Sequence, residues 1–185
     1  MKKKFLTNDR ITLRAVEPED LNIMYEMEND SYMWDISNFT VPYSRYVLRQ
    51  YIESSQCDVF ADKQLRLMIV RRCDCCVLGT IDITDFVPLH SRGEVGIALH
   101  RHFRGQGYAA DALNLLCEYA FEFLSLKQLY AHIAVDNKDC IDLFASCGFI
   151  RVGILKEWLQ IGGVYKDVAL LQYLNPKKKE KGDSV

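Results

Sequence analysis

Glu94-Val95-Gly96-Ile97-Ala98-Leu99 is followed by His100-Arg101-His102-Phe103 and then by Arg104-Gly105-Gln106-Gly107-Tyr108-Ala109-Ala110. The first run is typical of a strand, and the residues from Tyr108 to about Leu124 carry apolar side chains at helical spacing. The two glycines between them let the backbone curl, so that successive N–H groups point into one hollow at the positive end of the helix. No acid occurs from Val95 to Ala110. We therefore expect a phosphate-bearing ligand here rather than a turn that only starts a helix.

Outward from this segment, patterns of period two predict strands and patterns of helical period predict helices. Toward the N-terminus we expect a strand over Ile11–Ala15, helices opening at Glu17 and at Pro42, and strands over Leu65–Val70 and Val77–Phe86. Toward the C-terminus we expect a strand over Leu129–Val135, a short helix over Lys138–Cys147, and strands over Phe149–Trp158 and Val164–Tyr173.

This order predicts an α+β fold. We expect one mixed, mostly antiparallel sheet with helices on both faces and one parallel β-α-β crossover. The length of 185 residues and the hydrophobic content of 49% fit one domain with a sizeable core. We place that domain at residues 1–174, and expect the charged tail 175–185 to be disordered.

Composition excludes several classes of protein. The net charge is −2, so no basic field favours nucleic acid. The chain contains no apolar run long enough to cross a membrane, and the lysines at its start precede no apolar signal core, so we expect a cytoplasmic protein. Seven cysteines without an export signal are expected to be free thiols. The single C-x-x-C at Cys73–Cys76 lacks a second ligand pair, so we expect no metal.

Two phosphate-binding motifs compete at the glycine turn. The nucleoside-triphosphate loop requires a Lys after its last glycine, and none is present. Gly105, Gly107 and Ala110 satisfy the dinucleotide pattern, with Asp136 ending the next strand as a ribose ligand. That Asp lies later than the usual ~20 residues, and only one crossover is expected. An NAD-dependent oxidoreductase therefore ranks second.

Several motifs resemble the GNAT N-acetyltransferases. The family's acyl-coenzyme-A loop, R/Q-x-x-G-x-G/A, is matched from Arg104 to Ala109. Ala134-Val135-Asp136-Asn137 and Ser146-Cys147-Gly148-Phe149 look like the strand and helix that follow it. Gly153-Ile154-Leu155-Lys156 and Gly163-Val164-Tyr165-Lys166-Asp167 look like the closing hairpin of bacterial spermidine N-acetyltransferases and ribosomal-protein N-terminal acetyltransferases.

This resemblance implies a GNAT-like fold with acetyl-CoA as co-substrate. The backbone of Ile97, Ala98 and Leu99 would bind the pantetheine arm where the strand splays from its neighbour. The loop from Arg104 to Ala110 would wrap the pyrophosphate, with Asn137 hydrogen-bonded to the cofactor. The residues expected to bind the cofactor are thus Ile97, Ala98, Leu99, Arg104, Gly105, Gln106, Gly107, Tyr108, Ala109, Ala110 and Asn137.

Acetyl transfer to an amine requires removal of a proton, stabilisation of an oxyanion and departure of a thiolate. Glu94 is the candidate for the base or for binding the ammonium group, although it could be an ordinary carboxylate at the end of a strand. A backbone N–H near Ile97 would serve the oxyanion. Phe144 stands where the family carries a Tyr as general acid. Cys147 shares its helix face and could substitute; otherwise water protonates the thiolate, or the protein is slow or only an acyl-CoA sensor.

The acceptor side is marked by acids. Seven Asp and Glu residues and no Lys or Arg occur from Glu17 to Asp35. The resemblance puts the first two helices beside the acceptor groove, so Glu28, Asp30 and Trp34 are expected to bind substrate; a solvated helix face is the alternative. We predict an N-acetyltransferase for a cationic primary amine, a polyamine such as spermidine ahead of a protein N-terminus. A homo-oligomer stays open.

Overall fold

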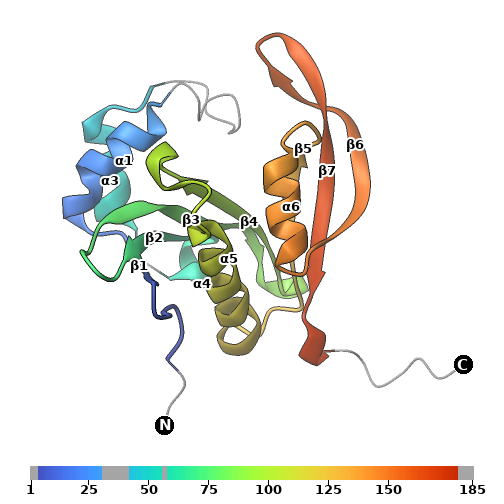
Figure 1. Cartoon of the computed structure of the whole chain (residues 1–185), viewed down its shortest axis with the longest axis horizontal. Helices are drawn as coiled ribbons and strands as arrows, with labels where there is room; N and C mark the ends of the chain where they lie inside the picture. The colour runs from blue at the N-terminus through green and yellow to red at the C-terminus, as the bar shows by residue number, and fades with distance from the viewer. Residues whose placement is uncertain (1–3, 31–41, 56–57, 179–185) are drawn as a thin grey trace, which may run out of the picture.

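In the computed structural model, which describes residues 4–30, 42–55 and 58–178, seven strands form one sheet in the order β1-β2-β3-β4-β5-β7-β6 (Figure 1). Only the β4–β5 pair is parallel, and the chain crosses between these strands through α5. The strands are β1 (Ile11–Ala15), β2 (Leu65–Arg71), β3 (Val77–Val87), β4 (Arg92–Leu99), β5 (Gln128–Ala134), β6 (Ile150–Ile161) and β7 (Val164–Leu174). The predicted mixed sheet with one crossover is confirmed.

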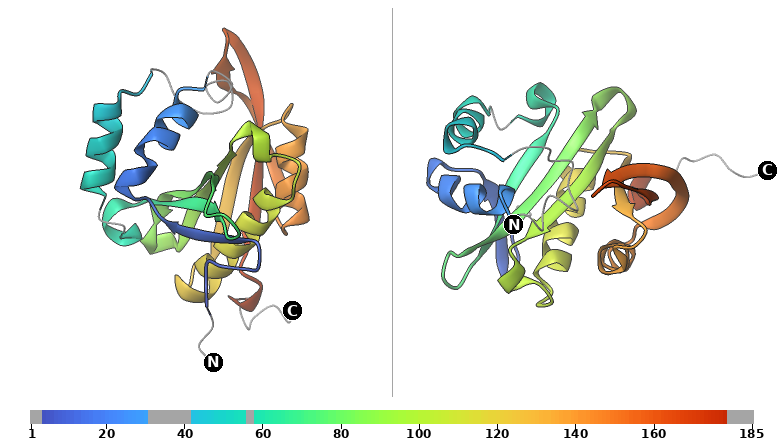
Figure 2. Two further views of the ribbon diagram at one scale, coloured as in Figure 1. Left: turned by 60° about the vertical axis from the view of Figure 1, so that its left-hand side comes forward. Right: turned by 90° about the horizontal axis from the view of Figure 1, so that it is seen from above.

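Helices cover both faces of the sheet, as predicted (Figure 2). The α-helices are α1 (Leu21–Glu28), α3 (Arg45–Ser54), α4 (Val59–Asp62), α5 (Tyr108–Glu118) and α6 (Lys138–Ser146). Adjacent residues of β2 reach opposite sides, because side chains alternate along a strand. Met68 packs with Met24 of α1 and Leu48 of α3, whereas Ile69 joins the larger core with Leu116 of α5. The single sheet therefore separates two apolar layers.

Two helical segments differ from the prediction. The helix expected from Tyr108 to Leu124 is α5 followed by a π-helical turn, η4 (Tyr119–Phe123). The four-residue α4 was not predicted, because a single turn is too short to show a helical period. Among the described residues, no helix is long and apolar enough to span a membrane.

The first residues of the predicted tail contact the rest of the structure. Asn175 is 3% exposed, and its side-chain amide donates to Leu126 O at 2.9 Å and to Phe121 O at 3.3 Å. Lys177 pairs with Glu122 at 2.6 Å. Asn175 thus belongs to the domain and not to an exposed tail, because its amide satisfies carbonyls at the end of the π-helical turn. Residues 179–185 lie outside the described part of the chain.

Candidate active site

The sheet opens into a wedge between its two parallel strands. Three residue pairs join β4 to β5, the last of them Glu94 with Tyr130. Beyond Glu94, β4 stays beside β3 as far as Leu99, whereas β5 follows β7 to Ala134. Within the described chain, the β5-facing edge of residues 95–99 therefore lacks a strand partner. Backbone groups along such an edge can bind an extended polar ligand.

The glycine loop follows the open end of β4 after one 3-10 turn, η3 (Arg101–Phe103). Gly105 has φ +72° and Gly107 has φ +83°, a region that side chains other than glycine rarely adopt. Gly107 is the N-cap of the eleven-residue α5, and its carbonyl accepts from Asp111 N at 3.1 Å. A Cβ at Gly105 would meet nothing within 4 Å, so open space lies beside this backbone. A curled backbone at a helix N-terminus suits a diphosphate group.

Side chains of the glycine loop hydrogen-bond to backbone carbonyls just before the loop. Arg104 Nε donates to Leu99 O at 3.0 Å, and Gln106 Nε2 donates to His102 O at 2.9 Å. Tyr108 is 9% exposed and packs into the main core. The stretch predicted to wrap a pyrophosphate is therefore one braced loop and the first turn of α5. Its contact with the cofactor stays a prediction.

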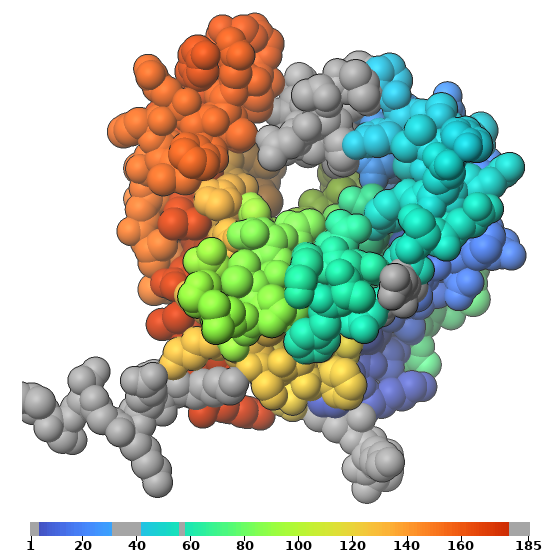
Figure 3. Space-filling view, turned by 180° about the vertical axis from the view of Figure 1, so that it is seen from behind, coloured from blue at the N-terminus to red at the C-terminus, as the bar shows by residue number. Residues whose placement is uncertain are grey.

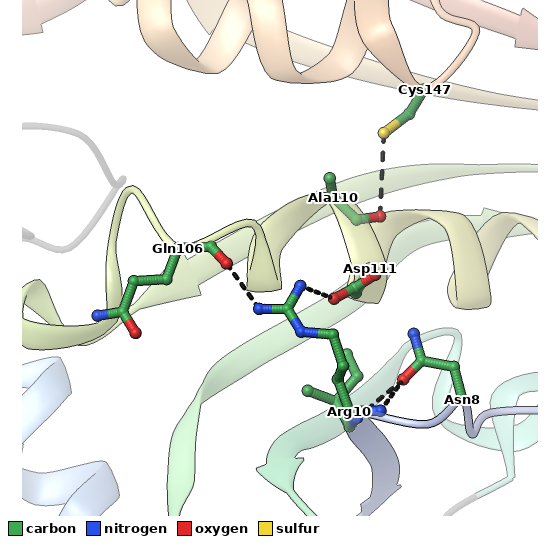
Figure 4. Close-up of polar contacts among 7 residues, drawn as sticks. Asn8, Arg10, Gln106, Ala110, Asp111 and Cys147 are labelled. Atoms are coloured by element: carbon green, nitrogen blue, oxygen red, sulfur yellow. Dashed lines mark hydrogen bonds and ion pairs between the residues drawn. The ribbon is translucent and has the colours of Figure 1, made fainter.

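Arg10, just before β1, also contacts this loop (Figure 4). Its guanidinium donates to Gln106 O and to Asp111 Oδ2, both at 2.7 Å. The same group lies 4.6 Å from the centre of the Tyr108 ring. No motif marks Arg10 in the sequence, because its partners lie about a hundred residues farther along the chain. The N-terminal segment thus forms part of the loop's structure.

Glu94 lies at the apex of the wedge and is bonded to a histidine that the sequence analysis missed. Its Oε1 lies 2.8 Å from His132 Nδ1, and both side chains are 29% exposed. The ring of His132 stacks on Trp158 of β6, with 6.3 Å between the ring centres. His132 and Tyr130 alternate with buried residues along β5, and this period of two was the available signal. A carboxylate and an imidazole in contact can accept and pass a proton.

Helix α6 has no tyrosine that could act as the general acid. Asn137 is its N-cap, with Oδ1 accepting from Cys140 N at 3.2 Å. Phe144 is 1% exposed and packs edge-on against Phe149. Burial raises the pKa of the Cys140 thiol to about 11 and also raises the pKa of Cys147, whose Sγ lies 4.0 Å from Ala110 O. These thiols therefore behave as packed, protonated groups.

Two acids of the acidic stretch, Asp20 and Glu28, are paired with arginine. Glu28 is 9% exposed and lies 2.7 Å from Arg66, which also contacts Asp82 at 2.9 Å. Burial raises the pKa of Glu28 even though Arg66 opposes that shift. Asp20 lies 2.6 Å from Arg14. The local charge counted from the sequence is thus partly cancelled, and Glu28 is held by Arg66.

The other two residues predicted to bind the acceptor are Asp30 and Trp34. Asp30 follows the end of α1, and its N–H donates to Met27 O at 3.3 Å. Trp34 lies outside the described residues. In the space-filling view, the β6–β7 hairpin stands away from the layer of α1 and α3 (Figure 3).

The dinucleotide alternative is wrong for this fold. A dinucleotide-binding sheet requires repeated parallel β-α-β units, whereas this sheet has one parallel pair. Asp136, the expected ribose ligand, lies 2.6 Å from Lys166 of β7. In residues 4–30, 42–55 and 58–178 no group of three or more His, Cys, Asp or Glu side chains is arranged to hold a metal ion.

Comparison with known proteins defines the class. Residues 10–150 match the model of the acetyltransferase (GNAT) domain family, so the chain belongs to the GNAT acetyltransferases and is an acyltransferase.

Individual relatives cover most of the chain. Spermidine N(1)-acetyltransferase of Vibrio cholerae is 28% identical over 170 residues, which are 92% of this chain and 96% of the relative. A crystal structure of spermidine N-acetyltransferase from Vibrio cholerae in complex with CoA and spermine superposes with a TM-score of 0.81 at 27% identity, over 91% of this chain and 97% of that one. Ribosomal-protein-serine acetyltransferase of Escherichia coli is 29% identical over 94 residues, 51% of this chain and 52% of the relative.

Proposed function

We propose that this protein transfers acetyl from acetyl-CoA to a cationic primary amine, and that the amine is a polyamine such as spermidine. The observation that carries the proposal is the wedge: β4 parts from β5 after Glu94 and leads, through one 3-10 turn, into the glycine loop. A thioester lying along Ile97, Ala98 and Leu99 with its diphosphate in the loop would bring its acetyl group toward the apex. The similarity to a spermidine acetyltransferase over nine-tenths of the chain supports the polyamine.

The chain's own groups suggest how the proton is handled. An alkylamine has a pKa near ~10 and arrives protonated at neutral pH. Glu94 would accept that proton, directly or through water, and His132 in contact with it would share the proton. A backbone N–H of β4 near Ile97 would donate to the developing oxyanion. Acetyl-CoA supplies the activated acyl group.

In α6, no tyrosine is available to protonate the departing thiolate. Phe144 carries no exchangeable proton, and the Cys147 thiol is directed at a carbonyl of α5. A free thiol has a pKa near ~8.5, so a thiolate can leave at neutral pH and take a proton from water, and water takes the second proton that the nitrogen loses on forming the amide. We therefore infer an enzyme that works without a general acid from α6. Cys147, a candidate for that role from its sequence position, is not needed in this scheme.

Replacing Phe144 by tyrosine tests this inference. We expect kcat with spermidine to stay equal or to rise, by no more than the 10²–10⁴-fold that a general acid typically contributes. The melting temperature should fall slightly because a hydroxyl enters a nearly buried site. Phe144→Leu, which removes the ring without adding a hydroxyl, is the control. A large loss of kcat in a stable Phe144→Tyr protein would mean that the ring has another task.

The acceptor is tested with an amine panel and mass-spectrometric detection of products. We expect acetylation of spermidine and spermine and little reaction with a neutral amine, because the sequence from Glu17 to Asp35 carries seven acids and no Lys or Arg, and only Asp20 and Glu28 of these are described above as paired with arginine. A peptide with a basic N-terminus is included. Reaction with the peptide alone would identify an N-terminal acetyltransferase, and acetyl-CoA binding without any product would identify an acyl-CoA sensor. Failure of the wild-type protein to bind acetyl-CoA in calorimetry would refute the donor assignment.

None of the contacts described above bears on the location of the protein or on its oligomeric state. The cytoplasmic location stays a prediction, and a homo-oligomer stays open. A small-molecule amine as partner is part of the proposal.

A further inference from the structure

Arg10 joins the two ends of the proposed pyrophosphate site. Its Nη2 donates to Gln106 O at 2.7 Å, which fixes the loop between the two positive-φ glycines. Its Nη1 pairs with Asp111 Oδ2 at 2.7 Å, in the first turn of α5. A Cβ built on Gly107 would lie 3.3 Å from Nη1, so the guanidinium lies against the loop. One planar group thus spans the loop and the helix that follows it.

The backbone around Arg10 is held in turn. The Oδ1 of Asn8 accepts from the N–H groups of Arg10 at 2.9 Å and Ile11 at 2.8 Å (Figure 4). Arg72 of the β2–β3 turn donates its N–H to Arg10 O at 2.9 Å and its Nη1 to Asn8 O at 2.8 Å. The backbone of Arg10 is therefore held in place next to β1, and its side chain extends from there to the loop.

The pairing of Arg10 with Asp111 changes the charge that an anion meets at the N-terminus of α5. An acid in the first turn stabilises a helix, because it lies at the positive end of the dipole. The same negative charge opposes a diphosphate at that helix end. Arg10 lies 2.7 Å from this carboxylate and offsets its charge. The Arg10 side chain is 48% exposed, and exposed ion pairs contribute little to folding stability.

We propose that Arg10 is a positioning residue for the acyl donor. It holds the glycine loop in its anion-binding shape, and it neutralises Asp111 so that the N-terminus of α5 attracts the pyrophosphate. This inference rests on the proposed use of acetyl-CoA. It adds a balance of charge to the site, in which Arg10, just before β1, offsets the negative charge of Asp111 in α5.

The test is a double-mutant comparison by calorimetry with coenzyme A, a probe whose binding needs no turnover. Arg10→Ala should weaken binding on the order of tenfold. Asp111→Asn alone should bind as well as the wild type or better. Adding Asp111→Asn to Arg10→Ala should restore part of the lost affinity, because the uncompensated charge is gone. The loss in Arg10→Ala should narrow as ionic strength rises.

Lys177→Ala is the matched control, since it removes another exposed cation that pairs with a carboxylate, here Glu122 of η4 and not a residue of the loop. It should leave affinity for coenzyme A unchanged. In kinetics, Arg10→Ala should raise the KM for acetyl-CoA while kcat at saturating donor and the KM for the amine stay unchanged. Arg10→Lys, which keeps the charge but not the fork, should lie between the wild type and Arg10→Ala.

The outcomes separate this inference from the proposed function. Wild-type affinity in Arg10→Ala would overturn the role of Arg10 and leave the acetyltransferase intact. A double variant as weak as Arg10→Ala would overturn the charge balance. If the wild-type protein itself fails to bind coenzyme A, the proposed use of acetyl-CoA as the acyl donor is wrong. A thermal melt of each variant verifies that the protein is folded.

Discussion

A Gly107→Val protein is expected to lose more than about a hundredfold in affinity for acetyl-CoA and to show almost no acetyl transfer. Gly107 has φ +83°, where a β-branched side chain is strained. Its Cβ would also stand 3.3 Å from Arg10, and the branches would project where phosphate must approach the backbone. Calorimetry with coenzyme A measures the loss directly. Both the torsion and the occupied space act against binding, so the effect should exceed that of any single polar contact.

The chain supplies a matched control for the strain alone. Gly163, in the turn between β6 and β7, has φ +82°, and a Cβ there would meet nothing within 4 Å. Gly163→Val therefore introduces the same backbone penalty at a site outside the loop. We expect it to lower the melting temperature but to keep wild-type affinity for coenzyme A. Equal losses in both variants, or full affinity in a folded Gly107→Val, would contradict the loop assignment.

The second large effect is expected for Glu94→Gln. Loss of the proton acceptor should lower kcat for spermidine by about 10²–10⁴-fold, with the KM for acetyl-CoA unchanged. Glutamine has nearly the same shape and can still contact His132, so the fold should be preserved. The deficit should shrink as pH rises toward the amine pKa of ~10, because more amine then arrives unprotonated. A pH profile of kcat/KM for both proteins measures this difference.

His132→Gln separates the two members of the pair. If His132 only shares the charge on Glu94, its loss should cost less than the loss of the carboxylate. A Glu94→Gln protein that keeps kcat but has a raised KM for the amine would show that Glu94 binds the ammonium group instead of accepting its proton.

The order of strands and helices could be predicted because each element carries a local pattern. The glycine loop between β4 and α5 is marked by Gly105 and Gly107, and the starts of α3 and α6 follow the N-cap residues Ser44 and Asn137. The extent of the wedge was less accessible. Strands of similar length fit complete pairing equally well, and only the resemblance to a family suggested that β4 leaves its neighbour.

The side chains of the site were harder to predict, because their partners are distant in sequence. Arg10 reaches a loop about a hundred residues away, and Glu94 meets His132 across the parallel pair. Counting acids from Glu17 to Asp35 overestimated the free charge, since Glu28 is paired with Arg66. Local composition fixes how many charges a segment carries, while the tertiary fold decides which of them face a substrate.

The short β4–β5 seam divides the molecule by task. Strands β1 to β4, together with α5, carry the glycine loop and the arginine that braces it. Strands β5 to β7, together with α6, carry His132 and the projecting hairpin. Since three residue pairs join these halves along the sheet, we expect substitutions in the projecting hairpin to leave the shape of the glycine loop unchanged. One half of the molecule can therefore diverge in sequence without rebuilding the other.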